Sequence, residues 1–311
     1  MFEVTLPVIG VSVDAVALVA LGVTVGFVSA FFGIGGGVIS VPMLHILFGI
    51  PYNFAVGTSP AVIFGTTVSG TLGHRRDQHV DYKLGAYMVI GAVVGVELGT
   101  SVVEVLKRAG TIVIASRRIE AVDFVLPLIY AVILTLMGVL FYLESVRRIR
   151  ELRADPSAPF VAPLSRFIRG ALWPPHISLP TSGIERISLW TIVGFGLAQG
   201  FVAGLLGVGG GIVLVPVLIY LLGIPTVVAI GTSLFATVFA SGIATLSHAR
   251  KGNCDIVLAV CLLVGSTVGA QIGAFVVRKL RGVQIRRAFA FLACAVAAVV
   301  VLKVLVKLGF F

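Results

Sequence analysis

Long apolar runs alternate with short polar segments along the whole chain. Eight runs approach or exceed the roughly 20 residues that a helix needs to cross a lipid bilayer. They cover residues 14–32, 54–73, 84–106, 123–143, 189–206, 226–246, 256–277 and 288–308. Two shorter apolar runs, 38–48 and 212–222, are too short to cross alone. The pattern predicts an all-α polytopic membrane protein.

The composition favours the same fold class. Hydrophobic residues make up 58% of the 311 residues and charged residues 12%, whereas soluble domains carry about 25% charged residues. A soluble helix bundle could not bury so much apolar surface. The net charge of +10 comes from Lys and Arg residues that lie mainly between the apolar runs. Because the positive-inside bias of membrane proteins produces this placement, we expect the lipid bilayer and no nucleic acid as a partner.

The cysteines and the N-terminus add little chemistry. Cys254, Cys261 and Cys294 are isolated and lack the spacing of a disulfide framework or a metal site, so no metal and no other cofactor is expected. The first residues carry no basic segment ahead of an apolar run, so a cleaved signal peptide is not expected either.

The chain contains two copies of one unit. Residues 26–76 and 200–250 align without a gap at an offset of 200 − 26 = 174, with 22 identical residues in 51 positions. The segments GFVSAFFGIGGGVISVP and GFVAGLLGVGGGIVLVP are each followed by GIP and then GTS. Chance does not produce this match. We expect an N-terminal transmembrane repeat (1–143), a polar basic linker (144–186) and a C-terminal transmembrane repeat (187–311).

Each half begins with a helical hairpin that glycines break and continues with three apolar runs. If the hairpin returns to its starting face, three crossings turn the second half upside down and leave more Lys and Arg on the linker face. That face is then cytoplasmic. If the hairpin crosses only once, the charge bias also permits parallel repeats, but we prefer inverted ones. Paired halves with interrupted apolar segments are typical of secondary transporters, which bind substrate between the halves near mid-membrane.

The glycine clusters are the first candidate substrate site. Glycine permits the backbone conformations and the close backbone approach that a break inside an apolar segment needs. A helix that starts there offers free N–H groups and the positive end of its dipole to an anion. The alternative is that glycine only lets helices pack closely. The candidates are Gly35, Gly36 and Gly37 in the first copy and Gly209, Gly210 and Gly211 in the second.

The paired GTS motifs are the second candidate. Thr58 and Ser59, with Thr232 and Ser233 in the other copy, carry hydroxyl groups in apolar surroundings. Hydroxyls in membrane helices can bond back to a carbonyl one turn earlier. Because these follow a glycine in both copies, we also consider them ligands of an oxyanion.

Glu97 lies near the middle of the run 84–106, where an ionised carboxylate is costly and is a functional candidate by default. Burial would raise its pKa and suit it to proton coupling. Its counterpart Gln271 cannot titrate, so a proton site would exist in one half only. The alternative is a protonated Glu97 that donates a hydrogen bond to a neighbouring helix.

Basic residues end the matching runs after the GTS motifs. His74 and Arg76, with His248 and Arg250 in the second copy, are candidates for a gate or a vestibule that attracts substrate. The favoured interpretation is structural, because cations complement the dipole at a helix C-terminus. Asp81 and Asp255, seven residues after each histidine, are expected to cap the next helices.

The doubled glycine motif, with GIP and GTS after each copy, resembles the TauE/SafE family of sulfite exporters over nearly the whole chain outside the linker. The resemblance implies an inner-membrane carrier without ATP hydrolysis for a small anion such as sulfite or an organosulfonate such as sulfoacetate. It places the substrate at the glycine turns and the GTS segments. Protons are a further expected partner, and nothing in the sequence predicts an oligomeric state.

Other function classes differ in how well the residues support them. An anion channel could use the same glycine turns, and a transporter of another small organic anion would carry the same motifs. A membrane subunit that docks a partner through the basic linker is a further alternative. No cluster of catalytic side chains, nucleophile motif or nucleotide loop supports a membrane enzyme.

Overall fold

The computed structural model describes residues 3–75, 80–114, 117–154, 173–277, 279–280 and 282–308. The first half forms the helices α1 (Ala15–Phe32), α2 (Gly37–Phe48), α3 (Tyr52–Arg75), α4 (Tyr82–Arg108) and α5 (Ala121–Ala154). The second half forms α7 (Leu189–Leu206), α8 (Gly211–Pro216) with a π-helical continuation η2 (Val217–Leu221), α9 (Thr226–Arg250), α10 (Ile256–Val277) and α11 (Gly282–Leu308).

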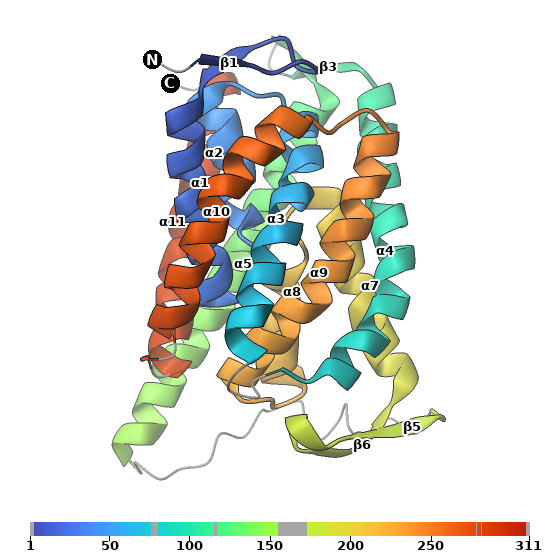
Figure 1. Ribbon diagram of the computed structural model, residues 1–311, viewed down its shortest axis with the longest axis vertical. Helices are drawn as coiled ribbons and strands as arrows, with labels where there is room; N and C mark the ends of the chain where they lie inside the picture. Colours follow the sequence, from blue (N-terminus) through green and yellow to red (C-terminus); the bar gives the residue numbers. More distant parts are fainter. Residues whose placement is uncertain are drawn as a thin grey trace.

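Three small antiparallel hairpins, which the apolar pattern did not predict, lie between the helices or ahead of them. They are β1–β2 (Glu3–Thr5, Ser12–Asp14), β3–β4 (Thr111–Ile114, Arg117–Glu120) and β5–β6 (His176–Leu179, Ile184–Ser188), the last with a 3₁₀ turn η1 (Pro180–Ser182). They lie at the ends of the helix bundle and form no continuous sheet among the described residues (Figure 1). The prediction of an all-α polytopic membrane protein is confirmed.

Seven of the described helices are long and apolar enough to cross a membrane: α1, α4, α5, α7, α9, α10 and α11. The eighth predicted run, residues 54–73, forms most of α3, which is less apolar because Thr, Ser and Gly interrupt it. Its hydroxyl side chains Thr58, Ser59, Thr66 and Thr67 are fully buried. Since α3 packs against α9 and α10, these side chains face protein and not lipid.

The two short apolar runs form the short helices that follow the glycine clusters, Gly37–Phe48 and Gly211–Leu221. α1 ends at Gly33 and α7 at Gly207, each in the left-handed conformation, and each of these residues donates its N–H to a carbonyl four residues earlier. The breaks inside both apolar segments are therefore real.

The two halves enter the bundle from opposite ends. The β1–β2 hairpin that leads into α1 lies at the upper end of Figure 1, and the β5–β6 hairpin that leads into α7 lies at the lower end. α1 packs mainly against α10 and α4 mainly against α7, while α3 packs against α9 and α5 against α11. Inverted repeats require this arrangement. Because the helices of the halves interleave, they do not form two separate bodies.

Glycine stripes bring the interleaved helices into backbone contact. In α4 a Cβ on Gly91, Gly95 or Gly99 would overlap backbone atoms of α7. In α10 a Cβ on Gly265, Gly269 or Gly273 would likewise overlap backbone atoms of α1. The two stripes lie 174 positions apart. Small residues at a spacing of four let membrane helices approach closely, so these contacts join the halves.

Replacing Gly95 with alanine should lower the Tm of the purified protein by several degrees. The new methyl group would overlap the carbonyl oxygen of Leu197, and overpacking of this kind costs about 1–3 kcal/mol. Gly194→Ala in α7 is the matched control, because a Cβ there meets no heavy atom within 4 Å. Thermal unfolding in detergent compares them, and equal Tm values for the two variants would contradict the close contact.

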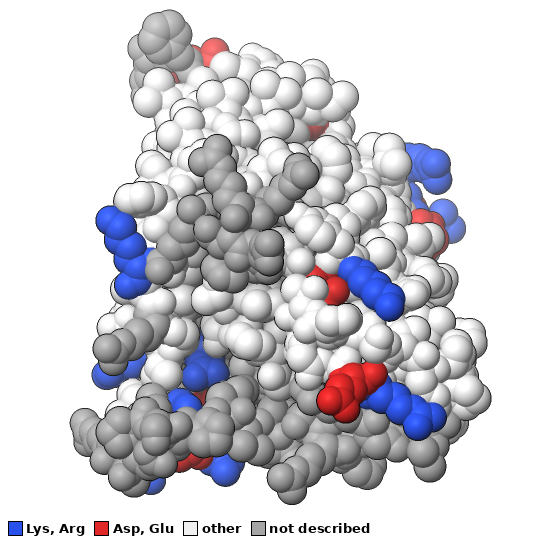
Figure 2. Space-filling view, turned by 60° about the horizontal axis from the view of Figure 1, so that its bottom comes forward, with Lys and Arg blue, Asp and Glu red and all other residues white. Residues whose placement is uncertain are grey.

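Both ends of the expected polar linker form secondary structure. α5 continues to Ala154, and the β5–β6 hairpin occupies residues 176–188; residues 155–172 lie outside the described part of the chain. Figure 2, turned so that the lower end comes forward, shows Lys and Arg side chains scattered over the visible face, with fewer Asp and Glu. The division into 1–143, 144–186 and 187–311 stays a prediction.

Candidate functional site

The two glycine turns adopt the same conformation. In the first turn φ is +72° at Gly33, +86° at Gly35 and +77° at Gly36, and the corresponding values in the second turn are +66°, +74° and +75°. L residues rarely adopt such angles, so each turn depends on glycine. α2 and α8 begin at the residues that follow, Gly37 and Gly211.

The turns are in direct contact with each other. A Cβ on Gly37 would lie 2.6 Å from the carbonyl oxygen of Gly207 and would overlap the Cα of Val208. A Cβ on Gly211 would lie 2.6 Å from the Cα of Ile34 and 2.7 Å from the carbonyl oxygen of Gly33. The start of each short helix therefore rests on the backbone of the other turn, where the two halves meet.

Side chains of α3 and α9 enclose the paired turns. A Cβ on Gly35 or on Gly209 would approach both Ile63 and Thr237, which occupy equivalent positions in the two copies. The hydroxyl of Thr237 accepts a hydrogen bond from Nε2 of Gln199 at 3.3 Å. The surroundings of the turns are therefore apolar on one side and polar on the other.

Two polar groups beside the turns have no partner among the described residues. They are Oε1 of Gln199 and the hydroxyl of Ser29, both on fully buried side chains. A Cβ on Gly210 would overlap Gln199, and one on Gly36 would approach Ser29. Sequence reasoning missed both residues. The signal was present, because an amide inside the apolar helix α7 is a functional candidate by the same rule that selected Glu97.

The threonines of the GTS motifs connect the halves crosswise. The Thr58 hydroxyl accepts a hydrogen bond from the Asp255 N–H at 3.0 Å, and the Thr232 hydroxyl accepts one from the Asp81 N–H at 2.9 Å. The carboxylates of Asp255 and Asp81 in turn accept the N–H groups of Leu258 and Leu84. Both aspartates therefore cap the next helices, as predicted.

The serines of the same motifs bond at the turns. The Ser233 hydroxyl donates to the carbonyl of Gly33 at 2.8 Å, and the Ser59 hydroxyl shares a hydrogen bond of 2.6 Å with Ser40 in α2. All four GTS hydroxyl residues are fully buried. None of them lines the cavities of about 210, 320 and 350 Å³ found among the described residues. In this conformation the candidate substrate site at the turns and the GTS motifs is closed.

The hairpins at the two ends are attached to the same aspartates. The Val8 N–H, in the β1–β2 hairpin, donates to Oδ2 of Asp255 at 3.0 Å. The Ser182 hydroxyl, in the β5–β6 hairpin, donates to Oδ2 of Asp81 at 2.6 Å. Each end of the bundle is thus linked through one aspartate to a GTS threonine.

The expectation that the protein buries Glu97 is wrong. Its side chain is 59% exposed on the outside of α4, where it accepts hydrogen bonds from Lys251 at 3.1 Å and from Ser247 at 2.7 Å. Gln271 is exposed too and donates to Ser69 at 2.6 Å. Glu97 lies two positions from both Gly95 and Gly99, so it points away from the packed stripe. An ion pair, and not burial in protein, accommodates the charge.

Of the basic residues at the helix ends, His248 makes a structural contact. His248 is fully buried, and its Nε2 lies 2.9 Å from the carbonyl oxygen of Gly204 in α7. Arg250 is exposed in the last turn of α9. The side chain of His74, and Arg76 altogether, lie outside the described residues. A gating role for these four stays a prediction.

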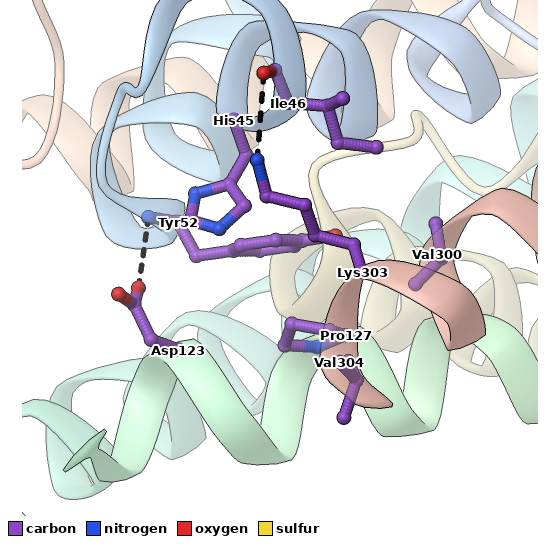
Figure 3. A pocket seen from close by; sticks show the side chains of 8 residues that line it. All are labelled: His45, Ile46, Tyr52, Asp123, Pro127, Val300, Lys303 and Val304. Atoms are coloured by element: carbon purple, nitrogen blue, oxygen red, sulfur yellow. Dashed lines mark hydrogen bonds between the residues drawn. The ribbon is translucent and has the colours of Figure 1, made fainter. Parts of the chain in front are cut away.

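A pocket where α2, α3, α5 and α11 meet is too small for a substrate. Figure 3 shows Lys303 reaching from α11 to the carbonyl of Ile46 near the end of α2, at 3.5 Å, and the Tyr52 N–H donating to Asp123 at 3.2 Å. Its free volume of about 10 Å³ accommodates at most one water molecule. These contacts secure the ends of the helices.

Comparison with known proteins places the chain in a family. The family model described as "Sulfite exporter TauE/SafE" matches residues 18–300. The probable membrane transporter protein YunE of Bacillus subtilis is 28% identical over 275 residues, which cover 86% of this chain and 89% of that protein. A probable membrane transporter protein of Xylella fastidiosa strain 9a5c is 25% identical over 92% of this chain and 94% of its own length.

A plant relative carries the family name itself. Sulfite exporter TauE/SafE family protein 3 of Arabidopsis thaliana is 26% identical over 84% of this chain and 72% of its own length. No solved structure matches the chain.

Proposed function

Because the chain belongs to the sulfite exporter TauE/SafE family, and is therefore a multi-pass membrane transporter and not an enzyme, we propose that it is a secondary transporter of small sulfur-containing anions. Sulfite and sulfoacetate are the proposed substrates. The proposed location is the inner (plasma) membrane, with the linker face in the cytoplasm. A potential that is negative inside would drive such anions outward, by about 2.3 kcal/mol per charge for each 100 mV.

The contact between the two glycine turns is the observation that carries this proposal. α2 starts at Gly37, directly against the second turn. A helix start of this kind, with the positive end of its dipole, favours an anion without a buried lysine. The buried Ser29 hydroxyl and Gln199 Oε1, which have no partner among the described residues, lie next to the backbone of the turns. They supply a polar lining that an apolar packing site would not need.

The threonines suit the proposed site because of the bonds they already make. Thr58 and Thr232 each accept a backbone N–H, so each still has its own hydroxyl proton to donate, which Thr58 directs to the Cys254 thiol in this conformation. When the turns separate, these hydroxyls would donate to an anion between them. The aspartates that hold the threonines also hold the end hairpins, which would couple substrate binding to opening of an end.

Anion flux into proteoliposomes tests the proposal. We expect saturable flux of sulfite or sulfoacetate that depends on the electrical potential across the membrane. Absence of saturable flux for both anions would overturn the proposed substrate class. Unitary currents in planar bilayers would instead identify an anion channel. Saturable flux of a different small organic anion would identify a transporter of that anion.

We also propose that Glu97 couples transport to protons, since protonation would release Lys251. Glu97→Gln should remove the stimulation of sulfite flux by a pH gradient while leaving flux at equal pH measurable. Glu104→Gln is the matched control, because Glu104 is a carboxylate on the same helix, paired with Arg108 at 3.2 Å. A pH-gradient response that survives in Glu97→Gln would rule out this role.

A further inference from the structure

A further cavity, with polar side chains on part of its wall, lies at the end of the bundle that carries the β3–β4 hairpin. Its volume is about 320 Å³, whereas one water molecule takes up about 30 Å³ in the liquid. A small hydrated anion would therefore fit. The cavity, which we call the β3–β4 vestibule, is lined by Pro51, Asn53, Phe54, Lys107, Gly110, Thr111, Glu120 and Val122.

Hydrogen-bond donors converge on one wall of the vestibule. The Lys107 ammonium donates to Oδ1 of Asn253 at 3.0 Å, and Nδ2 of Asn53 donates to the same oxygen at 3.4 Å. An ammonium has three protons to donate and an amide nitrogen has two, so both groups keep donors for a ligand. Within the described ranges Lys107 forms no ion pair with a carboxylate.

Asn253, directly behind these two residues, has an unused donor of its own. The residue is fully buried, and its Nδ2 has no partner among the described residues. A buried polar group without a partner costs about 1–3 kcal/mol. The orientation of the amide follows from its oxygen, which must face the ammonium of Lys107. Asn253 does not line the cavity itself, but its oxygen holds the Lys107 and Asn53 donors at the wall.

The vestibule adjoins the first GTS motif. A Cβ on Gly57 would lie 2.7 Å from the carbonyl carbon of Asn253, and the Asp255 N–H bonds to Thr58. Residues 253–255 thus separate the vestibule from the hydroxyl groups assigned to the central site. Movement of this short segment would connect the two.

We propose that the β3–β4 vestibule is an anion-binding site at one end of the transport pathway, with Lys107 and Asn53 as its donors and Asn253 as the residue that positions both. The choice of ligand, sulfite or a small sulfonate, rests on the proposed function. Val227 stands where Asn53 does in the first copy, so the described residues at the other end lack this amide donor. Glu120 lines the same cavity, and its negative charge limits the affinity.

Anion binding to the purified full-length protein tests this site directly. Its Tm is measured in detergent during titration with sodium sulfite or sodium sulfoacetate, against sodium chloride at equal ionic strength. Lys107→Gln should weaken the apparent Kd about tenfold, since a hydrogen bond to a charged group contributes about 1.5–3 kcal/mol. Glu120→Gln should tighten it about two- to threefold, as expected for an exposed charge.

Lys83→Gln is the matched control. Lys83 lies at the opposite end of α4 and donates to the Ser178 carbonyl at 3.0 Å, so its loss should leave the Kd unchanged. The proposal is overturned if neither anion raises the Tm beyond chloride, if Lys107→Gln behaves like Lys83→Gln, or if Glu120→Gln weakens binding. Both vestibule side chains are exposed, so neither change should prevent folding.

Flux measurements separate this site from the transport proposal. If the wild type transports sulfite but Lys107→Gln keeps the wild-type Kd, the vestibule is not an anion-binding site, and the proposed transport function stands. If the wild type transports neither anion but binds sulfite in a manner that needs Lys107, the site stands and the proposed function falls.

Discussion

Replacing Gly37 with alanine should abolish saturable anion flux and lower the Tm by several degrees. The new methyl group would meet the Cα of Val208 and the carbonyl oxygen of Gly207. These are backbone atoms that no side-chain rotation can move aside. The two turns would have to separate, at a cost of about 1–3 kcal/mol or more. The start of α2 would then leave the position in which it faces the opposite half.

The matching change in the other copy, Gly211→Ala, should have the same effect, because its Cβ would meet Ile34 and the Gly33 carbonyl in the same way. Gly194→Ala controls for glycine replacement in a membrane helix. Sulfite flux in proteoliposomes is measured per folded protein, and folding is followed by thermal unfolding. Wild-type flux in Gly37→Ala would contradict a role for the contact between the turns. A lowered Tm with normal flux would show that the contact between the turns contributes to stability and not to transport.

Thr58→Val should lower sulfite flux about tenfold and should also lower stability. Valine keeps the shape of threonine but leaves the buried Asp255 N–H without an acceptor, which costs about 1–3 kcal/mol. It also removes the hydroxyl proton that would be donated to the anion. Thr232→Val removes the equivalent acceptor from Asp81 and should act alike.

Thr58→Ser separates the chemistry of this residue from its packing. Serine restores the hydroxyl without the methyl group, so it should recover most of the flux and a KM close to that of the wild type. Thr267→Val is the control, because the Thr267 hydroxyl bonds only within its own helix, to the carbonyl of Val264 at 2.9 Å. Equal KM values for Thr58→Val and Thr58→Ser would show that the hydroxyl does not bind substrate.

Much of the fold could be predicted from the sequence, because a bilayer leaves the chain few choices. Backbone polar groups cannot stay unpaired in lipid, so long apolar runs must be helices. Glycine clusters inside two such runs must break them, and both breaks occur where expected, at Gly33 and Gly207. The constant offset of 174 positions relates two turns whose glycine φ angles are closely alike. Helix caps such as Asp81 were predictable as well, since capping depends on a few neighbouring residues.

The position of Glu97 shows how a one-dimensional pattern misleads. A position in the middle of an apolar run suggests burial in protein, but burial depends on which face of the helix a residue occupies. Gly91, Gly95 and Gly99 recur every four residues and mark the face of α4 that packs on α7. Glu97 lies between two of them in sequence and on the opposite side of the helix. The small-residue stripe was visible in the sequence and would have corrected the prediction.

The sequence alone reveals where helices start, break and repeat, because these properties depend on residues that are close together in the chain. Only the tertiary structure reveals that the first turn rests on the second, or that Thr58 holds Asp255, 197 positions away. It also brings Lys107 to Asn253, 146 positions away. Such pairings depend on how helices from the two halves interleave, and no local pattern of apolar and polar residues encodes that arrangement.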